Sequence, residues 1–387
     1  MRGGPLDGIR VIEVGSIGPG PFCAMLLADL GADVIRLDRP NEVGPFTDEI
    51  IGNEVLHRSR RSVAIDLKHS GAVALVMELV DRSDVMIEGF RPGVVDRLGL
   101  GPDVVHQRNP RLIYGRMTGW GEDGPLSQLA GHDINYLAIA GVLGGLGPGD
   151  APPSPPLNLV GDYGGGGMLL ALGIVSALVS RSVTGRGQTV DAAMVDGAAL
   201  LMGPNLPYFK TGAWGERGEG IIDGGAPYYR VYETADHRQI AFGAMERPFY
   251  EQMLRGLGLN DVDVSQQDER ALWPDLRRRI AEIVRGRTRD EWEGHFAGFD
   301  ACFSPVLEPL ESPDHPHSRG RHAFVELGGL SQPAPAPRFS QTPCPAPGRA
   351  CRPGEHTESA LLDWDIPSAL ISGAVRDGVL CKAPISE

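Results

Sequence analysis

The sequence predicts an α/β fold, in which a large domain with a mainly parallel sheet is followed by a smaller α+β domain. Short β-branched segments alternate with helical segments in the N-terminal third of the chain, which is typical of a parallel sheet. At 387 residues the chain is too long for one small core. Hydrophobic residues make up 42% of the chain and charged residues 22%, as is ordinary for a soluble globular protein.

The elements of the large domain follow this alternation in order. Prolines at 19 and 21 suit the start of the first helix, because proline is tolerated in a first helical turn. An apolar helix at 168–180 leads through a Gly-containing turn into the last strand. The expected strands are 8–14, 32–37, 62–67, 84–87, 111–117 and 188–192, and the expected helices between them include 22–30 and 71–80.

Beyond residue 200 the pattern changes. A hairpin-like pair of strands is expected within 228–243, and helices are expected at 247–257 and 272–285. Thr288 with Glu291 predicts a capping box at the start of a third helix. The predicted organisation is a large domain at 1–200, a Gly-rich linker at 201–227, a small α+β domain at 228–309, and a return linker with a C-terminal segment at 310–387.

Composition excludes several classes of function. The net charge of −14 argues against nucleic acid as the main partner. The five cysteines are widely spaced without a Cys-x-x-Cys pair, which indicates a reducing compartment, no disulfide framework and no zinc site. The N-terminus has no apolar signal core, and the longest apolar run, 168–179, is too short to span a bilayer. We therefore expect a cytoplasmic protein with no membrane span and no bound metal.

Two segments contain the main candidates for proton-transfer chemistry. His132 lies in a mostly uncharged neighbourhood, and an imidazole titrates near neutrality. Asp162 precedes four consecutive glycines, which allow a ligand to approach the backbone, and amide groups at a helix start favour a developing anion. Helix capping explains either residue about as well. A third candidate, Glu246, is by itself better explained as an acid favoured by a helix dipole.

Several arginines lie at or just beyond expected strand ends, the edge at which ligands bind in open α/β sheets. Arginine suits bidentate contact with phosphate, although a solvated surface arginine is the more common case for any single one. The segment 15–20 lacks the spacing of the dinucleotide fingerprint, and there is no Gly-x-Ser-x-Gly hydrolase motif. The candidates for phosphate binding are Arg39, Arg58, Arg60, Arg61 and Arg91.

Together these segments resemble the class III CoA-transferase (CaiB/BaiF-like) superfamily, and within it the branch of 2-methylacyl-CoA racemases. The segment around Asp162 is shared across the superfamily, whereas Gly-His-Asp-Ile-Asn-Tyr at 131–136 and the Glu of Ala-Met-Glu-Arg-Pro-Phe-Tyr at 244–250 are more typical of the racemase branch. Where this chain has His-Arg-Ser-Arg-Arg-Ser at 57–62, the family often has a lysine, so the roles of these arginines stay open. The resemblance covers nearly the whole chain and rests on residues 5–40, 88–101, 131–147, 155–168, 185–197 and 224–250.

The resemblance implies an interlocked homodimer, in which each chain has a Rossmann-like large domain that binds CoA and a small domain joined to it by long crossing linkers. The active site would lie between the large domain of one subunit and the small domain of the other. His132 and Asp162 would be the two acid/base groups, and Glu246 would orient the imidazole. The residues expected to bind CoA are Arg39, Arg91, Arg61 and Tyr136.

The activity implied by the resemblance is racemisation of a 2-methylacyl-CoA thioester. One group removes the α-proton to give an enolate, and the other returns a proton to the opposite face. Coenzyme A is then part of the substrate, and no further cofactor is expected. The alternative is a CoA transferase in which Asp162 attacks an acyl-CoA as a nucleophile. A CoA-binding protein without activity and, more distantly, a dehydrogenase remain as further alternatives.

Overall fold

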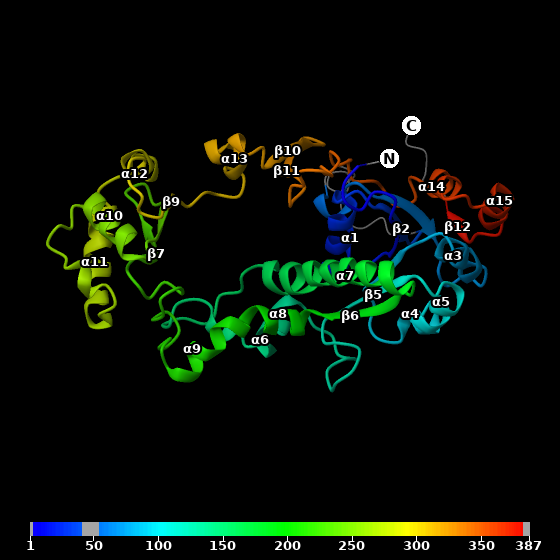
Figure 1. The fold of residues 1–387 in the computed structure, drawn as a ribbon, viewed down its shortest axis with the longest axis horizontal. Helices are drawn as coiled ribbons and strands as arrows, with labels where there is room; N and C mark the ends of the chain where they lie inside the picture. The colour runs from blue at the N-terminus through cyan, green and yellow to red at the C-terminus, as the bar shows by residue number, and fades with distance from the viewer. Residues whose placement is uncertain (1–2, 41–53, 382–387) are drawn as a thin grey trace. The chain divides into compact units, whose positions relative to one another are not determined.

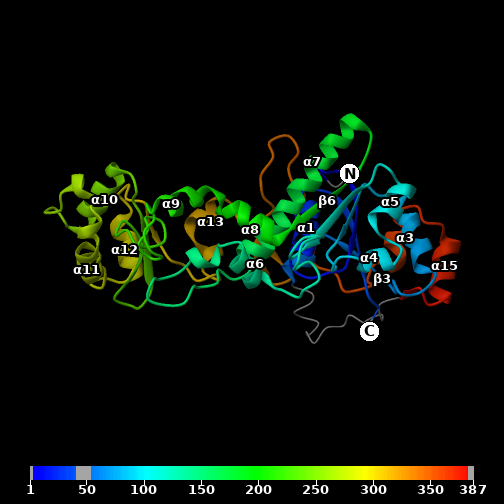
Figure 2. The ribbon, with the colours of Figure 1, turned by 90° about the horizontal axis from the view of Figure 1, so that it is seen from below.

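The computed structural model describes residues 3–40 and 54–381, which form two compact units (Figures 1 and 2). The large unit contains the chain up to Ala140 together with Pro156–Leu201 and the segment from Pro316 onward. The small unit contains Gly141–Pro155 and Met202–His315. The Pro/Gly-rich segment after Gly141 belongs to the small unit because it contacts the stretch around Arg217, whose Nε donates to the Pro148 carbonyl at 3.1 Å.

The large unit is built on a seven-stranded sheet, counted over the described residues, with the strand order β12-β3-β2-β1-β4-β5-β6. All neighbours pair in parallel except β12, which is antiparallel to β3. The predicted α/β class with a mainly parallel sheet is therefore confirmed. The strands are β1 (Arg10–Val14), β2 (Asp33–Asp38), β3 (Arg61–Ile65), β4 (Val85–Glu88), β5 (Ile113–Thr118), β6 (Gln188–Ala193) and β12 (Leu380–Cys381).

Helices cover both faces of this sheet, so its central strands are apolar on both sides (Figure 1). On one face, Ile12 and Ile35 pack with α3, α5, α14 and α15. On the other, Val11 and Val34 pack with α1, α6 and α7. The helices of this unit are α1 (Pro19–Asp29), α3 (Ala72–Val80), α4 (Val94–Arg97), α5 (Pro102–Arg108), α6 (Asp133–Ile139), α7 (Leu169–Thr184), α8 (Met194–Met202), α13 (Pro316–Gly320), α14 (Thr357–Asp363) and α15 (Ser368–Arg376), with the short η1 (Val55–His57) before β3.

The helix expected from residue 168 begins earlier, as a π-helix, η3 (Leu159–Met168), that continues into α7. Its glycines allow the wider helix to lie directly against α8: a Cβ on Gly165 would stand 2.7 Å from the amide nitrogen of Ala198. The continuous segment 159–184 is 26 residues long and contains an 18-residue window with a mean hydropathy of 1.6, so among the described helices it alone is long and apolar enough to cross a membrane. That is weak evidence for a span, because Leu170 and Ile174 of this helix are fully buried in the core of the large unit.

The small unit packs helices on an antiparallel sheet of order β7-β8-β9. Helix α10 (Arg247–Leu257) occupies the predicted residues, α11 (Trp273–Val284) is shorter by one residue at each end, and the Thr288–Glu291 capping box begins α12. The two segments expected to be irregular hold more structure than predicted. The segment 201–227 contains α9 (Leu206–Thr211) in the small unit, and the return segment contains the hairpin β10 (Phe324–Leu327)–β11 (Leu330–Pro333), which belongs to the large unit. The remaining elements are β7 (Tyr229–Glu233), β8 (Gln239–Gly243), β9 (Phe303–Pro305), α12 (Arg289–Phe296), η2 (Leu143–Gly145), η4 (Gly203–Asn205), η5 (Val264–Gln266), η6 (Arg270–Leu272) and η7 (Ser312–Asp314).

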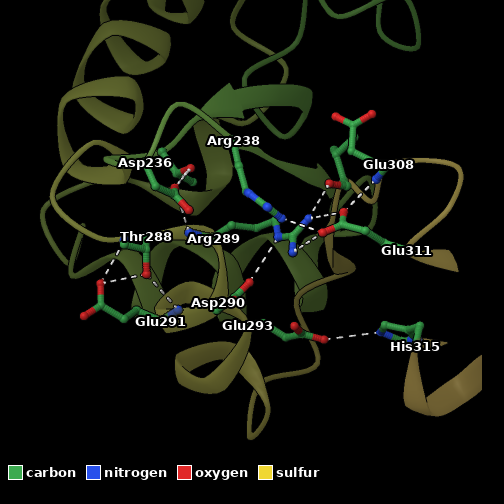
Figure 3. A network of polar contacts seen from close by, with 12 residues as sticks. Asp236, Arg238, Thr288, Arg289, Asp290, Glu291, Glu293, Glu308, Glu311 and His315 are labelled. Carbon is green, nitrogen blue, oxygen red and sulfur yellow. Dashed lines mark hydrogen bonds and ion pairs between the residues drawn. The ribbon is translucent and has the colours of Figure 1, made fainter.

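A polar cluster joins α12 to the chain that leaves this sheet (Figure 3). The Arg289 guanidinium is buried and donates to both carboxylate oxygens of Glu311, at 2.7 and 3.1 Å. Arg238, from the turn after β7, donates to the same carboxylate at 2.5 Å. Glu311 therefore ties the start of the return segment to two different elements of the small unit.

Candidate active site

His132 is presented by the start of helix α6. It is the N-cap residue, with extended backbone, and its side chain is exposed. The Asn135 side chain accepts a hydrogen bond from the His132 amide at 3.0 Å, which satisfies one donor at the helix start and defines where α6 begins. The exposed imidazole itself belongs to this capping box with Asn135, so it is presented from a defined backbone position at the start of α6.

Asp162 lies inside the π-helix, one turn before the glycine-rich contact with α8. Its carboxylate accepts a hydrogen bond from Asn158 Nδ2 at 3.2 Å. A Cβ on Gly18, which has φ of 71°, would stand 3.2 Å from Asp162 Oδ2, so the carboxylate lies beside the loop that follows β1. Burial, and secondarily the charge of Asp133, hold the pKa of Asp162 above its ordinary value, although Asn158 and His132 act in the opposite direction.

Fewer amide groups near the start of the π-helix are available to bind an anion than the sequence predicts. The Asp162 amide donates to Asp133 Oδ2 at 2.8 Å, and the Tyr163 amide donates to the Asn158 carbonyl at 3.3 Å. These two donors therefore do not face a ligand. The expectation that the amides from Asp162 onward form an anion site is wrong for its first two members, because a neighbouring carboxylate and the helix itself use them.

The loops that follow β1 and β4 meet at the point where the strand order reverses. A Cβ on Gly89 would lie 2.9 Å from Ser16 Oγ, which shows that the two loops approach each other closely. In open α/β sheets the crevice at this point receives the ligand. Asp162 lies next to the first of these loops, and Arg91, which is exposed, belongs to the second. The Phe90 amide donates to Glu88 Oε2 at 2.8 Å and orders the loop before Arg91.

Tyr136 is buried in the core on one face of the large sheet. Its ring lies edge-on to Trp120 with centroids 4.7 Å apart, and burial raises the pKa of its hydroxyl. The charges of Asp162 and Asp133 raise that pKa further, whereas Arg91 lowers it. Asp162, Asp133 and Arg91 thus all act electrostatically on Tyr136 within the large unit. Arg39 follows the carboxyl end of β2 and is exposed at the same edge of the sheet.

Arg61 lies at the opposite edge. It is the first residue of β3, and its guanidinium donates to Asp33 at 2.7 and 2.8 Å and to Asp363 at 2.8 Å. The expectation that Arg58, Arg60 and Arg61 lie beyond a strand end is therefore wrong, since all three lie before or at the beginning of β3. The structure does not bring Arg61 together with Arg39 and Arg91.

Arg58 and Arg60 are not solvated surface residues either. Arg58 is buried and donates to Asp29 Oδ1 at 3.1 Å, and Arg60 is buried in an ion pair with Glu13. Their charges are used inside the protein, where an isolated charge would be very costly. Both arginines consequently join the segment before β3 to α1 and β1.

Glu246 belongs to the small unit, at the N-cap of α10, and its side chain is exposed. Its carboxylate makes no capping hydrogen bond, but its position at the helix N-terminus agrees with the expectation of an acid favoured by the helix dipole. The buried Gln267 donates through Nε2 to the Met245 carbonyl at 2.7 Å and thus fixes the backbone that presents Glu246.

Sequence reasoning missed three residues that shape this site: Asp133, Asn158 and Glu88. Burial raises the pKa of Glu88 to about 7, although hydrogen bonds from Phe90 and Arg116 oppose the rise. The signal for Asp133 was its place directly after His132, and for Asn158 its spacing of four residues from Asp162, which is one turn of helix. Among the described residues no group of three or more His, Cys, Asp or Glu side chains is placed to hold a metal ion.

Comparison with known proteins supplies the family. The model of CoA-transferase family III matches residues 6–357. The chain is 44% identical to the alpha-methylacyl-CoA racemase of Mus musculus and 43% identical to that of Homo sapiens, in each case over 93% of both chains. Among solved structures, a CaiB/BaiF family protein from Brucella suis matches with a TM-score of 0.79 and 25% identity, over 94% of this chain and all of that one. The chain is therefore a member of CoA-transferase family III.

Proposed function

We propose that this protein is a racemase of 2-methylacyl-CoA thioesters, which moves the α-proton from one face of the carbon to the other through an enolate. The observation that carries the proposal is the placement of Asp162: a half-buried carboxylate with a raised pKa, at the ligand-binding edge of the sheet and within electrostatic reach of His132. The resemblance to the mouse and human racemases supports the same reaction.

The raised pKa of Asp162 suits a reaction that must run in both directions. An ordinary aspartate titrates near about 3.9 and an ordinary imidazole near about 6.5. Raising the carboxyl pKa makes Asp162 a stronger base and a more persistent conjugate acid, so it can remove the α-proton from one epimer and return a proton toward the other. In this proposal the thioester lies between them, and coenzyme A enters as part of the substrate without another cofactor.

The proposed CoA site uses Arg39, Arg91 and Tyr136 at the carboxyl edge of the sheet. The two guanidiniums suit the phosphates of CoA, and both follow the end of a strand, whereas Arg61 begins one. We leave Arg61 out of this site because Asp33 and Asp363 already bind its donors.

We propose further that Glu246 reaches His132 from the second subunit of a homodimer. The large unit carries an unusual apolar surface that a second copy would cover, since Met168, Leu172, Val179 and Val183 on one side of the π-helix and α7 are all more than half exposed. Mixing the inactive variants His132→Ala and Glu246→Ala tests this arrangement. If subunits exchange, mixed dimers regain one intact site, and about a quarter of wild-type activity returns. Two variants that stay inactive after exchange would exclude a shared site.

Deuterium exchange tests the reaction itself. One epimer of a 2-methylacyl-CoA, incubated in D₂O with the protein, should take up α-deuterium and lose configuration. His132→Ala and Asp162→Asn should each abolish racemisation, since a two-base mechanism needs both groups. Arg61→Ala is the matched control, because it removes a charge far from the carboxyl edge of the sheet.

A CoA transferase is the second candidate, because the family as a whole is named for that reaction and Asp162 is a carboxylate able to attack an acyl-CoA. In that case the exchange assay shows no α-deuterium, CoA passes to a free carboxylic acid, and His132→Ala retains the transfer. This set of results would replace the racemase proposal.

A further inference from the structure

The Asp133 carboxylate connects the two candidate acid/base residues. Asp133 follows His132 directly at the start of α6, and its Oδ2 accepts the hydrogen bond from the Asp162 amide at 2.8 Å. The residue is 7% exposed, and its second oxygen, Oδ1, is buried without a hydrogen-bond partner among the described residues. A buried carboxylate with an unpaired oxygen is costly, so its presence calls for a reason beyond stability.

The neighbouring Gly161 allows this contact. A Cβ at position 161 would stand 2.4 Å from Asp133 Oδ2, well inside the closest approach of real side-chain atoms. Any other residue there would push the carboxylate away from the Asp162 amide. The π-helix and α6 are therefore joined at one point, where glycine makes room for the acid.

Few charged groups among the described residues act on Asp162. From α6, the titratable groups that face it are His132, Asp133 and Tyr136, and the charge of Arg91 reaches Tyr136 from the loop after β4. The loop before α1 contributes Gly18, which has no charge, and the π-helix contributes the neutral Asn158. Among the described residues, Asp133 is thus the negatively charged neighbour that acts on Asp162.

We propose that Asp133 is a positioning residue of the acid/base pair: its carboxylate holds the backbone of Asp162 at a fixed place relative to His132. Its negative charge also favours the protonated form of Asp162. The inference rests on the proposed racemase function and deepens it. It assigns Asp133 no contact with substrate. One side chain sets both the separation of the two groups and the proton affinity of one of them.

Three variants separate these effects. Asp133→Asn keeps an oxygen that accepts the Asp162 amide hydrogen bond but removes the charge. Asp133→Ala removes both, and Gly161→Ala displaces the carboxylate without changing it. Asp103→Asn, an exposed acid in the first turn of α5, is the control for losing a helix-start acid. Gly294→Ala, exposed on α12 with no neighbour within 4 Å of the added Cβ, is the control for an added methyl group.

The first measurement is a titration of the Asp162 carboxyl carbon by NMR in full-length protein labelled with ¹³Cγ-aspartate, with Asp162→Asn to assign the signal. Removing a negative neighbour favours the ionised form, so Asp133→Asn should move the Asp162 titration to lower pH. The Asp103→Asn control should leave it in place. A titration that is unchanged in Asp133→Asn would overturn the electrostatic part of the inference, whether or not the protein is a racemase.

The second measurement is the pH dependence of kcat and KM for α-proton exchange. Asp133→Ala and Gly161→Ala should lower kcat by about 10²-fold with little change in KM, because misplacing a reacting group by about 1 Å costs that much. In Asp133→Asn the limb of the pH profile set by Asp162 should move to lower pH. If kcat stays at the wild-type value in folded Asp133→Ala and Gly161→Ala, the positioning role is refuted. Absence of exchange in the wild type would instead refute the proposed function, and the NMR titration then decides the inference.

Discussion

Replacing Gly197 with alanine would place a methyl group inside the contact between α8 and the π-helix that carries Asp162. The new Cβ would lie 1.9 Å from the Gly165 carbonyl oxygen and 2.7 Å from the Gly165 Cα. These atoms are backbone, so no side chain can rotate to make room. Since ordinary contacts begin near 3.4 Å, one of the two helices must move by about 1.5 Å.

Two effects of this displacement can be measured. Overpacking of this kind costs about 1–3 kcal/mol of the free energy of unfolding, which lowers the melting temperature of a domain of this size by several degrees. A shift of this size in the π-helix also moves Asp162, and a misplacement of about 1 Å costs about 10²-fold in rate. We therefore expect Gly197→Ala to lower both the melting temperature and kcat for α-deuterium exchange.

The control for Gly197→Ala is again Gly294→Ala, where the added methyl group meets no atom within 4 Å. Because alanine is the better helix former, this variant should gain up to about 1 kcal/mol of stability and keep wild-type kcat. Both variants are followed by thermal unfolding and by the exchange assay. If Gly197→Ala melts and turns over like the wild type, the close packing of the π-helix against α8 does not position Asp162, and the reasoning fails.

Three further predictions concern binding and pH. Arg91→Ala should raise KM for acyl-CoA by about 10- to 100-fold with little change in kcat, since a hydrogen bond to a charged group contributes about 1.5–3 kcal/mol; steady-state kinetics with the free acyl-CoA checks this. Asn158→Ala removes a donor that lowers the pKa of Asp162, so the limb of the kcat profile that requires an ionised Asp162 should move to higher pH, opposite to the effect of Asp133→Asn. Hydrogen bonds from two arginines and from the backbone lower the pKa of Glu311 from its ordinary value of 4.5 to about 2, so its contribution to stability is present above about pH 4.5 and is lost as pH falls toward 2. The free energies of unfolding of wild type and Glu311→Gln, followed by acid unfolding, should differ above about pH 4.5 and become equal toward pH 2.

Elements whose signals are local were predicted well. Helix α10 occupies residues 247–257 as expected, with Pro248 in its first turn, and the capping box of Thr288 with Glu291 begins α12. The buried strands of the large sheet were recognised because their short β-branched runs sit between helical segments. In each case the deciding interactions lie within a few residues of one another, so the sequence pattern is sufficient.

Features that depend on distant contacts were missed or mistaken. The π-helix was expected as a helix start with free amides, but Asp133, 29 residues away, accepts the Asp162 amide hydrogen bond. Arg61 was expected to bind phosphate, yet it pairs with Asp33 and with Asp363, which is 302 residues away in the chain. The sequence alone showed that these hydrogen-bond donors were present, but it did not show which carboxylates would bind them in the folded chain.

By itself, the sequence determined the α/β class, the family, and the candidate residues His132, Asp162 and Glu246, because hydrophobic period, turn residues and short motifs are properties of neighbouring positions. Only the tertiary structure decided that Asp162 lies beside the loop after β1, that Asp133 holds its amide, and that Arg58, Arg60 and Arg61 are engaged in internal ion pairs. The physical reason is that a charge or a polar group acquires its role from the partner it meets on burial, and that partner is chosen by the packing of helices and strands far apart in the chain.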